Sequence, residues 1–245
     1  MADALLTVQG LGKRFGGFIA LDGIELEVRA GERVGLIGPN GSGKSTLVNC
    51  LSGIMRNEDG TVRFDGATLD GLPAHRRTRL GLARSFQLPK PFGSLSVAEN
   101  LRIPLLYTVD GRNGVHLGER DIAARCDELL AMVALDGKAR ARPRDLTQIE
   151  MRKLELARAM AAAPKLLIAD EAMAGLSHSE VDDIIALLFK LNESGIAVIL
   201  IEHIMRAVMS FSERLVVLVA GRKIADGLPQ DVVRNPEVER AYLGE

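Results

Sequence analysis

The sequence predicts an α/β protein with a parallel sheet at its centre, and two features of the chain predict it. First, short apolar runs alternate with longer amphipathic segments over the second half of the chain, which is the order strand–helix–strand. Second, polar residues do not interrupt these runs, as in strands that helices cover on both faces. The 245 residues, 47% of them hydrophobic, are enough to form a sizeable core.

The β-rich runs that open the chain differ from that pattern. We expect strands at Leu5–Gln9, Ile24–Val28, Arg33–Ile37 and Thr61–Asp65. The second alternates apolar and charged residues and predicts a half-buried strand, whereas the third is apolar from Val34 onward and predicts a strand buried on both faces. The dipeptide Asp65-Gly66 is typical of a hairpin turn, so the fourth is expected at a sheet edge. We therefore predict an antiparallel β subdomain near the N-terminus.

The middle of the chain, from about residue 88 to 162, has helical periodicity. One apolar stripe recurs at helical spacing through Ile122, Cys126, Leu129, Leu130 and Val133. A second helix, at about 148–162, is expected to end before Pro164. We predict that these residues form a helical subdomain inserted into a single unit that spans residues 1–245.

Strand and helix alternate after Pro164. We expect strands at Leu166–Ala169, Ala197–Ile201, Leu215–Val219 and Lys223–Ala225, helices at Glu180–Leu191 and Ile204–Phe211, and a polar helix at the C-terminus. Lys223–Ala225 is expected to end the sheet.

Composition excludes several classes of protein. Lys and Arg number 31 against 32 Asp and Glu, so no basic excess is present to neutralise the phosphates of a nucleic acid. Two cysteines, Cys50 and Cys126, are too few for a disulfide framework or a zinc site. Apolar runs fall short of the ~18 residues of a membrane-spanning helix, and the first residues lack the pattern of a signal peptide. We expect a cytoplasmic protein.

The strongest motif follows the third expected strand and leads into a helix that begins near Lys44. It matches the pattern G-x-x-x-x-G-K-[ST] through Gly38, Pro39, Asn40, Gly41, Ser42, Gly43, Lys44, Ser45 and Thr46. A triphosphate needs backbone N–H groups that point inward, and side chains at the glycines would block that approach. The N-terminal end of the helix attracts the same anion. We expect a P-loop NTPase core in which Lys44 reaches the β- and γ-phosphates of ATP and Ser45 ligates Mg²⁺.

Two adjacent carboxylates support this interpretation. Asp170 and Glu171 come directly after the apolar run Leu166–Ala169. Because ligands bind beyond the carboxyl ends of parallel strands, both side chains are expected beside the phosphate loop. Asp170 suits the Mg²⁺ shell through a water molecule, and Glu171 suits a base that orients or deprotonates the attacking water.

With these motifs in place, the chain resembles the ATP-binding subunit of an ABC transporter along its whole length. Phe15 resembles the aromatic residue that stacks on adenine, and Gln87 the glutamine that senses Mg²⁺ and faces the membrane subunits. Ala174–Ser177 lies where the loop exchanged between paired cassettes belongs, and His203 matches the histidine that contacts the γ-phosphate. The resemblance implies catalytic roles for Lys44, Gln87, Glu171 and His203, and a Mg²⁺ shell of Ser45, Gln87 and Asp170. A GTPase is disfavoured because the sequence lacks an Asn-Lys-x-Asp base reader.

Three segments are similar to the cassettes of branched-chain (hydrophobic) amino acid importers, a group whose relatives also move urea, amides or aromatic acids. They are Gly38–Gly53, Ser85–Asn100 and Asn235–Gly244. The resemblance implies membrane permease subunits as partners, an indirect periplasmic solute-binding protein, and a peripheral position on the inner face of the cell membrane. It does not identify the solute.

One segment departs from the family pattern. The signature, usually Leu-Ser-Gly/Tyr-Gly-Gln, aligns with Leu146, Thr147, Gln148, Ile149 and Glu150. Thr147 and Glu150 keep a capping box, so the helix is still expected. Ile149 replaces a glycine that admits the partner's phosphate, and a carboxylate at Glu150 would repel it by roughly 2–3 kcal/mol at ~6 Å and an effective dielectric of ~20. We therefore expect a hetero-pair with one competent and one weak ATP site. Ser177, where the family commonly has Asp or Asn, is a milder departure.

Two other classes stay open. A non-transport ABC ATPase of DNA repair or translation usually carries long coiled coils or two cassettes in one chain. A regulatory nucleotide-binding cassette with little hydrolysis is favoured by Ile149 and Glu150 and disfavoured by Glu171.

Three further segments are expected at the surface, one rich in proline and two basic. Leu88–Phe92 is stiffened by prolines and ends in an aromatic residue, which suits a groove for a helix of a membrane subunit. A packed proline turn is the alternative. The basic residues His75–Arg79 and those at Arg140, Arg142 and Arg144 are expected on solvated helix faces rather than in lipid or nucleic-acid patches.

Overall fold

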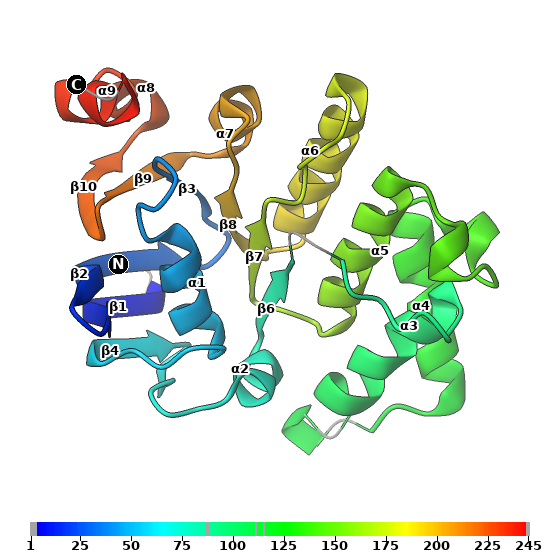
Figure 1. The fold of residues 1–245 in the computed structure, drawn as a ribbon. Coiled ribbons are helices and arrows are strands. Elements are labelled where there is room, and N and C mark those ends of the chain that lie inside the picture. The colour runs from blue at the N-terminus through cyan, green and yellow to red at the C-terminus, as the bar shows by residue number, and fades with distance from the viewer. Residues whose placement is uncertain (1–3, 87–88, 111, 115, 244–245) are drawn as a thin grey trace.

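The computed structural model describes residues 4–86, 89–110, 112–114 and 116–243, and the strands in these ranges form two sheets (Figure 1). The smaller sheet is antiparallel, with the order β2-β1-β4-β5. Its strands are β1 (Ala4–Phe15), β2 (Phe18–Arg29), β4 (Asp59–Phe64) and β5 (Ala67–Thr68). This sheet is the antiparallel β unit that the first apolar runs predict.

The larger sheet has the order β10-β9-β3-β8-β7-β6. Its strands are β3 (Arg33–Ile37), β6 (Leu82–Ser85), β7 (Leu166–Asp170), β8 (Ala197–Ile201), β9 (Arg214–Val219) and β10 (Arg222–Gly227). Strands β6 to β9 and β3 run parallel, and β10 closes one edge as the antiparallel partner of β9. The predicted α/β fold with a parallel sheet is confirmed.

Helices connect and cover the strands. They are α1 (Lys44–Ser52), α2 (Ala74–Leu80), α3 (Val97–Pro104), α4 (Glu119–Met132), α5 (Gln148–Ala161), α6 (His178–Glu193), α7 (Met205–Phe211), α8 (Pro229–Val232) and α9 (Pro236–Leu243). Shorter helical turns lie at Leu105–Val109, Arg112–Gly114, Asp136–Lys138 and Pro143–Asp145. None of the described helices is both long and apolar enough to cross a membrane.

Apolar strands separate the core into layers on the two faces of the larger sheet. Along β7, Leu166 and Ile168 pack with the smaller sheet and α1, whereas Leu167 and Ala169 pack with α4, α5 and α6. Side chains of successive strand residues point to opposite faces, so an uninterrupted apolar run serves both layers. Figure 1 shows α6 and α7 on one side of this sheet and α1 with the smaller sheet on the other.

Helices α3, α4 and α5 pack together beside β6 (Figure 1). In the sequence they lie between β6 and β7. The predicted stripe on α4 is buried, with Ile122, Cys126, Leu129 and Leu130 at most 3% exposed. Helix α5 begins after Thr147, whose side chain accepts a hydrogen bond from the Glu150 N–H, while the Glu150 carboxylate accepts one from the Thr147 N–H. The predicted capping box is therefore present.

Three details of the fold differ from the sequence-based expectations. The hairpin at Asp65-Gly66 forms, but β4 lies between β1 and β5, so it is not the edge strand. The sequence pattern does not predict β6, which is only four residues long and has Arg84 and Ser85 after Leu82 and Ala83.

The third difference is Arg77, which was expected on a solvated helix face. Its side chain is 1% exposed and donates to the main-chain carbonyls of Cys50, Leu51 and Leu72. The expectation was wrong for this residue because the last carbonyls of α1 have no partner within the helix and need a donor. Burial lowers the pKa of the Arg77 guanidinium.

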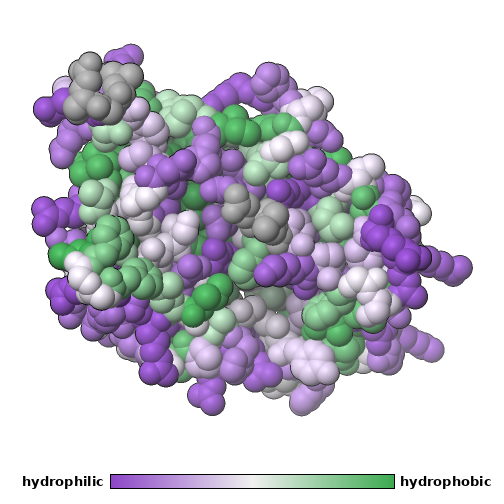
Figure 2. All heavy atoms as spheres, viewed as in Figure 1, coloured by the Kyte–Doolittle hydropathy of each residue, from purple (hydrophilic) through white to green (hydrophobic). Residues whose placement is uncertain are grey.

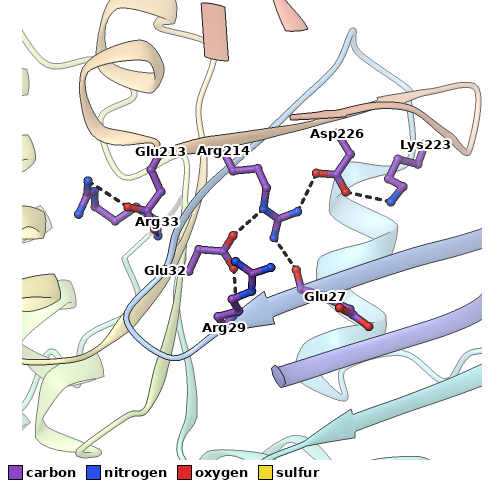
Figure 3. A network of polar contacts seen from close by, with 8 residues as sticks. All are labelled: Glu27, Arg29, Glu32, Arg33, Glu213, Arg214, Lys223 and Asp226. Atoms are coloured by element: carbon purple, nitrogen blue, oxygen red, sulfur yellow. Dashed lines mark hydrogen bonds and ion pairs between the residues drawn. The ribbon is translucent and has the colours of Figure 1, made fainter. Parts of the chain in front are cut away.

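A network of charged side chains lies at the end of the larger sheet where β3 and β9 begin (Figure 3). Arg214 donates to Glu32 at 2.6 Å and to Asp226 at 2.7 Å, and Asp226 also accepts from Lys223 at 2.9 Å. The second oxygen of Glu32 accepts the Arg29 N–H at 2.7 Å. These contacts join β2, β9, β10 and the turn before β3 at the end of the sheet that lies away from the carboxyl ends of the parallel strands.

Candidate functional site

The strand order places three loops side by side at the carboxyl ends of the parallel strands of the larger sheet. Strand β8 lies between β3 and β7, so the segments that follow these three strands are neighbours. They contain the phosphate loop after β3, Glu171 after β7 and His203 after β8. A cavity of about 260 Å³ joins them, lined by Phe15, Phe18, Ala20, Asn40, Gly41, Ser42, Gly43, Lys44, Ser45, Thr46, Glu171 and His203. The structure thus brings together most of the residues that the sequence singles out.

The phosphate loop has a backbone that requires glycine at two positions. Gly38 has φ 151°, and a Cβ there would lie 2.1 Å from the Leu218 carbonyl oxygen. Gly43, which precedes α1, has φ 103°, and a Cβ there would lie 2.8 Å from the Ala20 carbonyl oxygen. Only glycine fits both the conformation and the space. The loop therefore lies close to β2 and β9 and leads directly into the first turn of α1.

Lys44 is the buried cation of this loop. Its ammonium donates to the carbonyl oxygens of Gly38 at 2.7 Å and Pro39 at 3.0 Å. Burial lowers the pKa of Lys44, and the nearby carboxylates of Glu171 and Asp170 act in the opposite direction. The ammonium thus lies within electrostatic range of both acids and at the mouth of a loop suited to phosphate.

Glu171 and His203 form a direct pair across two strands. The imidazole Nε2 of His203 lies 3.0 Å from Oε1 of Glu171. Glu171 has φ 48°, which is rare for a residue with a side chain and costs about 1 kcal/mol, and its N–H donates to the Ile201 carbonyl. The chain therefore turns sharply at the end of β7, and the turn directs the carboxylate to the cavity.

Glu202 stabilises that turn through a hydrogen bond to the main chain. Its carboxylate is buried and accepts the Met173 N–H at 2.8 Å, so it fixes the segment that follows Glu171. Burial raises the pKa of Glu202, while hydrogen bonds from the backbone N–H groups of Met173 and His203 lower it.

Asp170 lies at the end of β7 and is paired with Arg84 on β6. The Arg84 Nη2 is 2.6 Å from Oδ2 of Asp170, and both side chains are about one-tenth exposed. Arg84 also donates to Oδ1 of Asn49 on α1 at 2.7 Å. The sequence does not single out Arg84, because its partners are 35 and 86 residues away in the chain.

Two aromatic side chains lie at the open side of the cavity. Phe15 is 48% exposed, with the Lys13 ammonium 5.4 Å from its ring centroid, and Phe18 is 63% exposed. Exposed flat rings beside a phosphate loop offer a stacking surface for a purine base. Phe18 was missed in the sequence, although it belongs to the same hairpin as Phe15.

The divergent signature is held within its own chain. Glu150 accepts a hydrogen bond from Lys138, with the closer contact at 2.6 Å, and this bond is the main cause that lowers the pKa of Glu150. Ile149 packs against the core of the helical segment, and Gln148 donates to the Ala174 carbonyl at 3.3 Å. Lys138 offsets the charge of Glu150. The carboxylate would therefore repel a partner's phosphate less strongly than the value expected for an unpaired carboxylate.

Three other residues of interest have different placements. Gln87 lies outside the described residues. Ser177 is the N-cap of α6, and its hydroxyl bonds to Glu180. Tyr242 on α9 has its hydroxyl beside the Gly38 N–H, and burial is the main cause that raises its pKa. The sequence motif around Tyr242 indicated only a subfamily, so its contact with the phosphate loop was not anticipated.

The parallel sheet, the phosphate loop and the two acids together define a P-loop nucleotide-binding protein. Residues 21–174 match the ABC transporter family, and residues 222–245 match a family described as branched-chain amino acid ATP-binding cassette transporter. The chain therefore belongs to the ABC transporter family and is an ATPase with the α/β P-loop NTPase fold.

Individual relatives cover the whole chain. The high-affinity branched-chain amino acid transport ATP-binding protein BraF of Pseudomonas aeruginosa is 38% identical over 254 residues, and LivG of Salmonella typhimurium, of the same description, is 36% identical over 256; both matches cover 100% of each chain. Among solved structures, an ABC transporter cassette in its ADP conformation superposes with a TM-score of 0.87 at 29% identity, covering 99% of this chain and 100% of that one. A dimeric cassette in a post-hydrolysis state, bound to ADP and Pi, gives 0.81 at 26%, covering 91% and 98%.

Proposed function

We propose that this chain is the ATP-hydrolysing subunit of an importer for branched-chain or other hydrophobic amino acids, or related small solutes. The observation that carries the proposal is the cavity in which the phosphate loop, Glu171 and His203 meet. The branched-chain match at residues 222–245 and the names of the relatives support the solute class. Residues 1–245 act as a single cassette, bound peripherally to the inner face of the cell membrane through permease subunits.

The side chains around the cavity take complementary roles in hydrolysis. The loop N–H groups and Lys44 bind the triphosphate, and the exposed ring of Phe15 stacks on the adenine. Glu171 orients the attacking water and accepts its proton. His203 contacts the γ-phosphate, and its 3.0 Å bond to Glu171 keeps the carboxylate oriented to the same space.

The donor set beside the loop fits Mg²⁺. Ser45 presents an exposed hydroxyl at the start of α1, and Asp170 presents a carboxylate at the end of β7. Oxygen ligands of this kind, with water completing the shell, are what Mg²⁺ prefers. Gln87 is the third proposed ligand. When bound, Mg²⁺ offsets the negative charge of the phosphates.

A groove between the larger sheet and helices α3 and α5 is the proposed binding site for a helix of a permease subunit. It has a volume of about 630 Å³, and Phe86, Phe92 and Tyr107 are among the residues that line it. Figure 2 shows apolar side chains beside a hollow at this junction. Asn100 holds the main chain of Phe92 through two hydrogen bonds while the ring stays 43% exposed. A fixed turn with an exposed ring favours the docking groove over a packed proline turn.

The signature supports pairing with a different cassette. The Ile149 side chain packs against the helical segment, and the Glu150 carboxylate is bound to Lys138. The Glu150 N–H already donates to the Thr147 hydroxyl, so the first turn of α5 offers a partner's phosphate fewer open groups than a signature with glycine would. The loop of this chain would then work with the signature of its partner, and the reciprocal site would be weak. A periplasmic solute-binding protein would act through the permeases.

Two measurements test the proposal. Affinity purification of the chain from membranes should recover two apolar permease subunits and a second cassette, and the ATPase rate should rise when that cassette is added. A chain that binds ATP but recovers no membrane subunit would favour a non-transport ATPase. Cooperative hydrolysis at a full rate by the chain alone would exclude the hetero-pair, and no hydrolysis in any assembly would favour a regulatory module.

A further inference from the structure

Arg84 connects three parts of the molecule. It lies on β6, donates to Asn49 on the helix that follows the phosphate loop, and is ion-paired with Asp170 at the end of β7. Its guanidinium also lies 5.0 Å from the ring centroid of Phe86, and both residues line the groove. A second contact with α1, at 3.3 Å, goes to the Ser52 hydroxyl.

The ion pair engages one oxygen of the Asp170 carboxylate. Arg84 contacts Oδ2 of Asp170 through a single nitrogen, Nη2, while Nη1 is engaged by Asn49. The planar guanidinium fork holds these two acceptors at a fixed separation, which a flexible ammonium would not do. The carboxylate is thus oriented through Oδ2, and no hydrogen bond from the described residues reaches its Oδ1, which we assign to a ligand or a bound water.

We propose that Arg84 is a positioning residue for Mg²⁺-dependent nucleotide binding. It orients the carboxylate of Asp170 and ties it to α1, so that the acid and the Ser45 hydroxyl keep a fixed relation. Outer contacts that orient a metal ligand commonly change metal affinity by about 10- to 100-fold when removed. Because Arg84 also lines the groove, the position of Asp170 depends on a residue that a docked helix would touch. The inference rests on the proposed function and concerns the same site.

The test measures ATP affinity with and without the metal. A fluorescent, slowly hydrolysed ATP analogue is titrated into the wild-type chain and into Arg84→Met, once with EDTA and once with Mg²⁺. We expect Arg84→Met to bind the analogue in EDTA with the affinity of the wild type. The factor by which Mg²⁺ raises the affinity should be about 10-fold smaller for Arg84→Met than for the wild type. Arg84→Lys should recover part of this gain, because it restores the charge without the fork.

Matched variants separate this role from a structural one. Arg79→Met removes another cation that lines the groove but contacts the Tyr107 carbonyl, and it should respond to Mg²⁺ as the wild type does. Asn49→Ala should reproduce a weaker form of the Arg84→Met effect. The melting temperature of each variant reports folding.

The outcomes distinguish the inference from the proposed function. A folded Arg84→Met variant with the full Mg²⁺ gain, or one that loses affinity equally in EDTA and in Mg²⁺, would overturn the role of Arg84 alone. A wild-type chain whose affinity does not respond to Mg²⁺ would overturn the proposed donor set and the inference together.

Discussion

The carboxylate of Glu171 and the imidazole of His203 are joined at 3.0 Å although the residues follow different strands. Two features of the fold cause this contact. The strands β7 and β8 are parallel neighbours, so their carboxyl ends lie side by side. The left-handed backbone at Glu171 then turns its side chain toward the loop after β8. The pair lines the cavity that contains Lys44.

Replacement of Glu171 by Gln should abolish hydrolysis and leave ATP binding intact. The amide keeps the shape of the side chain but cannot accept a proton, and loss of a general base costs about 100-fold or more in rate. Phosphate release and analogue binding measure the two effects. Asp183→Asn, which alters an exposed carboxylate on α6, is the control. A Glu171→Gln variant that hydrolyses ATP at the wild-type rate would remove Glu171 from the mechanism.

Replacement of Ile149 by Gly should raise the ATPase rate of the chain on its own. The change restores the small residue of the family pattern in the first turn of α5 and opens the backbone to a partner's phosphate. The helix should lose about 1 kcal/mol in stability through the poor propensity of glycine, in addition to the lost packing. ATPase rates over a range of protein concentrations measure the effect. No change in a folded variant would mean that Ile149 does not limit the weak site.

Replacement of Phe92 by Ala should weaken assembly with the permease subunits without a change in ATP affinity. One contact of the ring is the Arg158 guanidinium, 5.2 Å from the ring centroid. Because the ring is otherwise exposed in the groove, a docked helix would cover it. Aromatic residues in the centre of an interface often contribute about 2 kcal/mol or more to binding. Recovery of the complex in detergent is the measurement, and Leu228→Ala, exposed and outside the groove, is the control. Unchanged assembly would support the packed proline turn.

Replacement of Arg77 by Met should lower the free energy of unfolding by about 3 kcal/mol. The variant leaves the buried carbonyl of Leu51 without its donor and leaves that of Cys50 with only the Gly53 N–H at 3.3 Å, and unsatisfied buried acceptors cost about 1–3 kcal/mol each. Urea denaturation measures the change. Arg76→Met, the exposed neighbour on α2, should stay within about 0.5 kcal/mol of the wild type. Equal stability of the two variants would contradict the capping role of Arg77.

Replacement of Glu202 by Gln should change how stability depends on pH. Burial raises the pKa of Glu202 above its ordinary value of ~4.3, so the folded state favours the neutral acid. The stability that this group contributes is fully present below the unfolded pKa and is lost as pH rises through the folded pKa. The stability difference between the Glu202→Gln variant and the wild type should therefore move in favour of the variant as pH rises above ~4.3. Melting curves measure it, with the exposed Glu193→Gln as control. A difference that is constant with pH would contradict the prediction.

The sequence predicted the elements whose signals are local and periodic. The boundaries of β3 and β8 agree with the expected strands, and the stripe on α4 is buried as its spacing requires. Strand β6 escaped notice because four residues with a central arginine give no clear alternation. Arg77 was misplaced because a run of basic residues on a short helix gives no sign that one of them turns inward.

The sequence by itself determined the phosphate loop, the parallel strands and the acids that follow them. Each of these depends on residues that are contiguous or regularly spaced, and their backbone requirements are local. Only the tertiary structure decided the pairings of Glu171 with His203, Asp170 with Arg84, and Glu150 with Lys138. Such pairs depend on strand order and on the turn of a chain in three dimensions. The physical reason is that a side chain's charge partner is chosen by distance in space, on which sequence separation sets no limit.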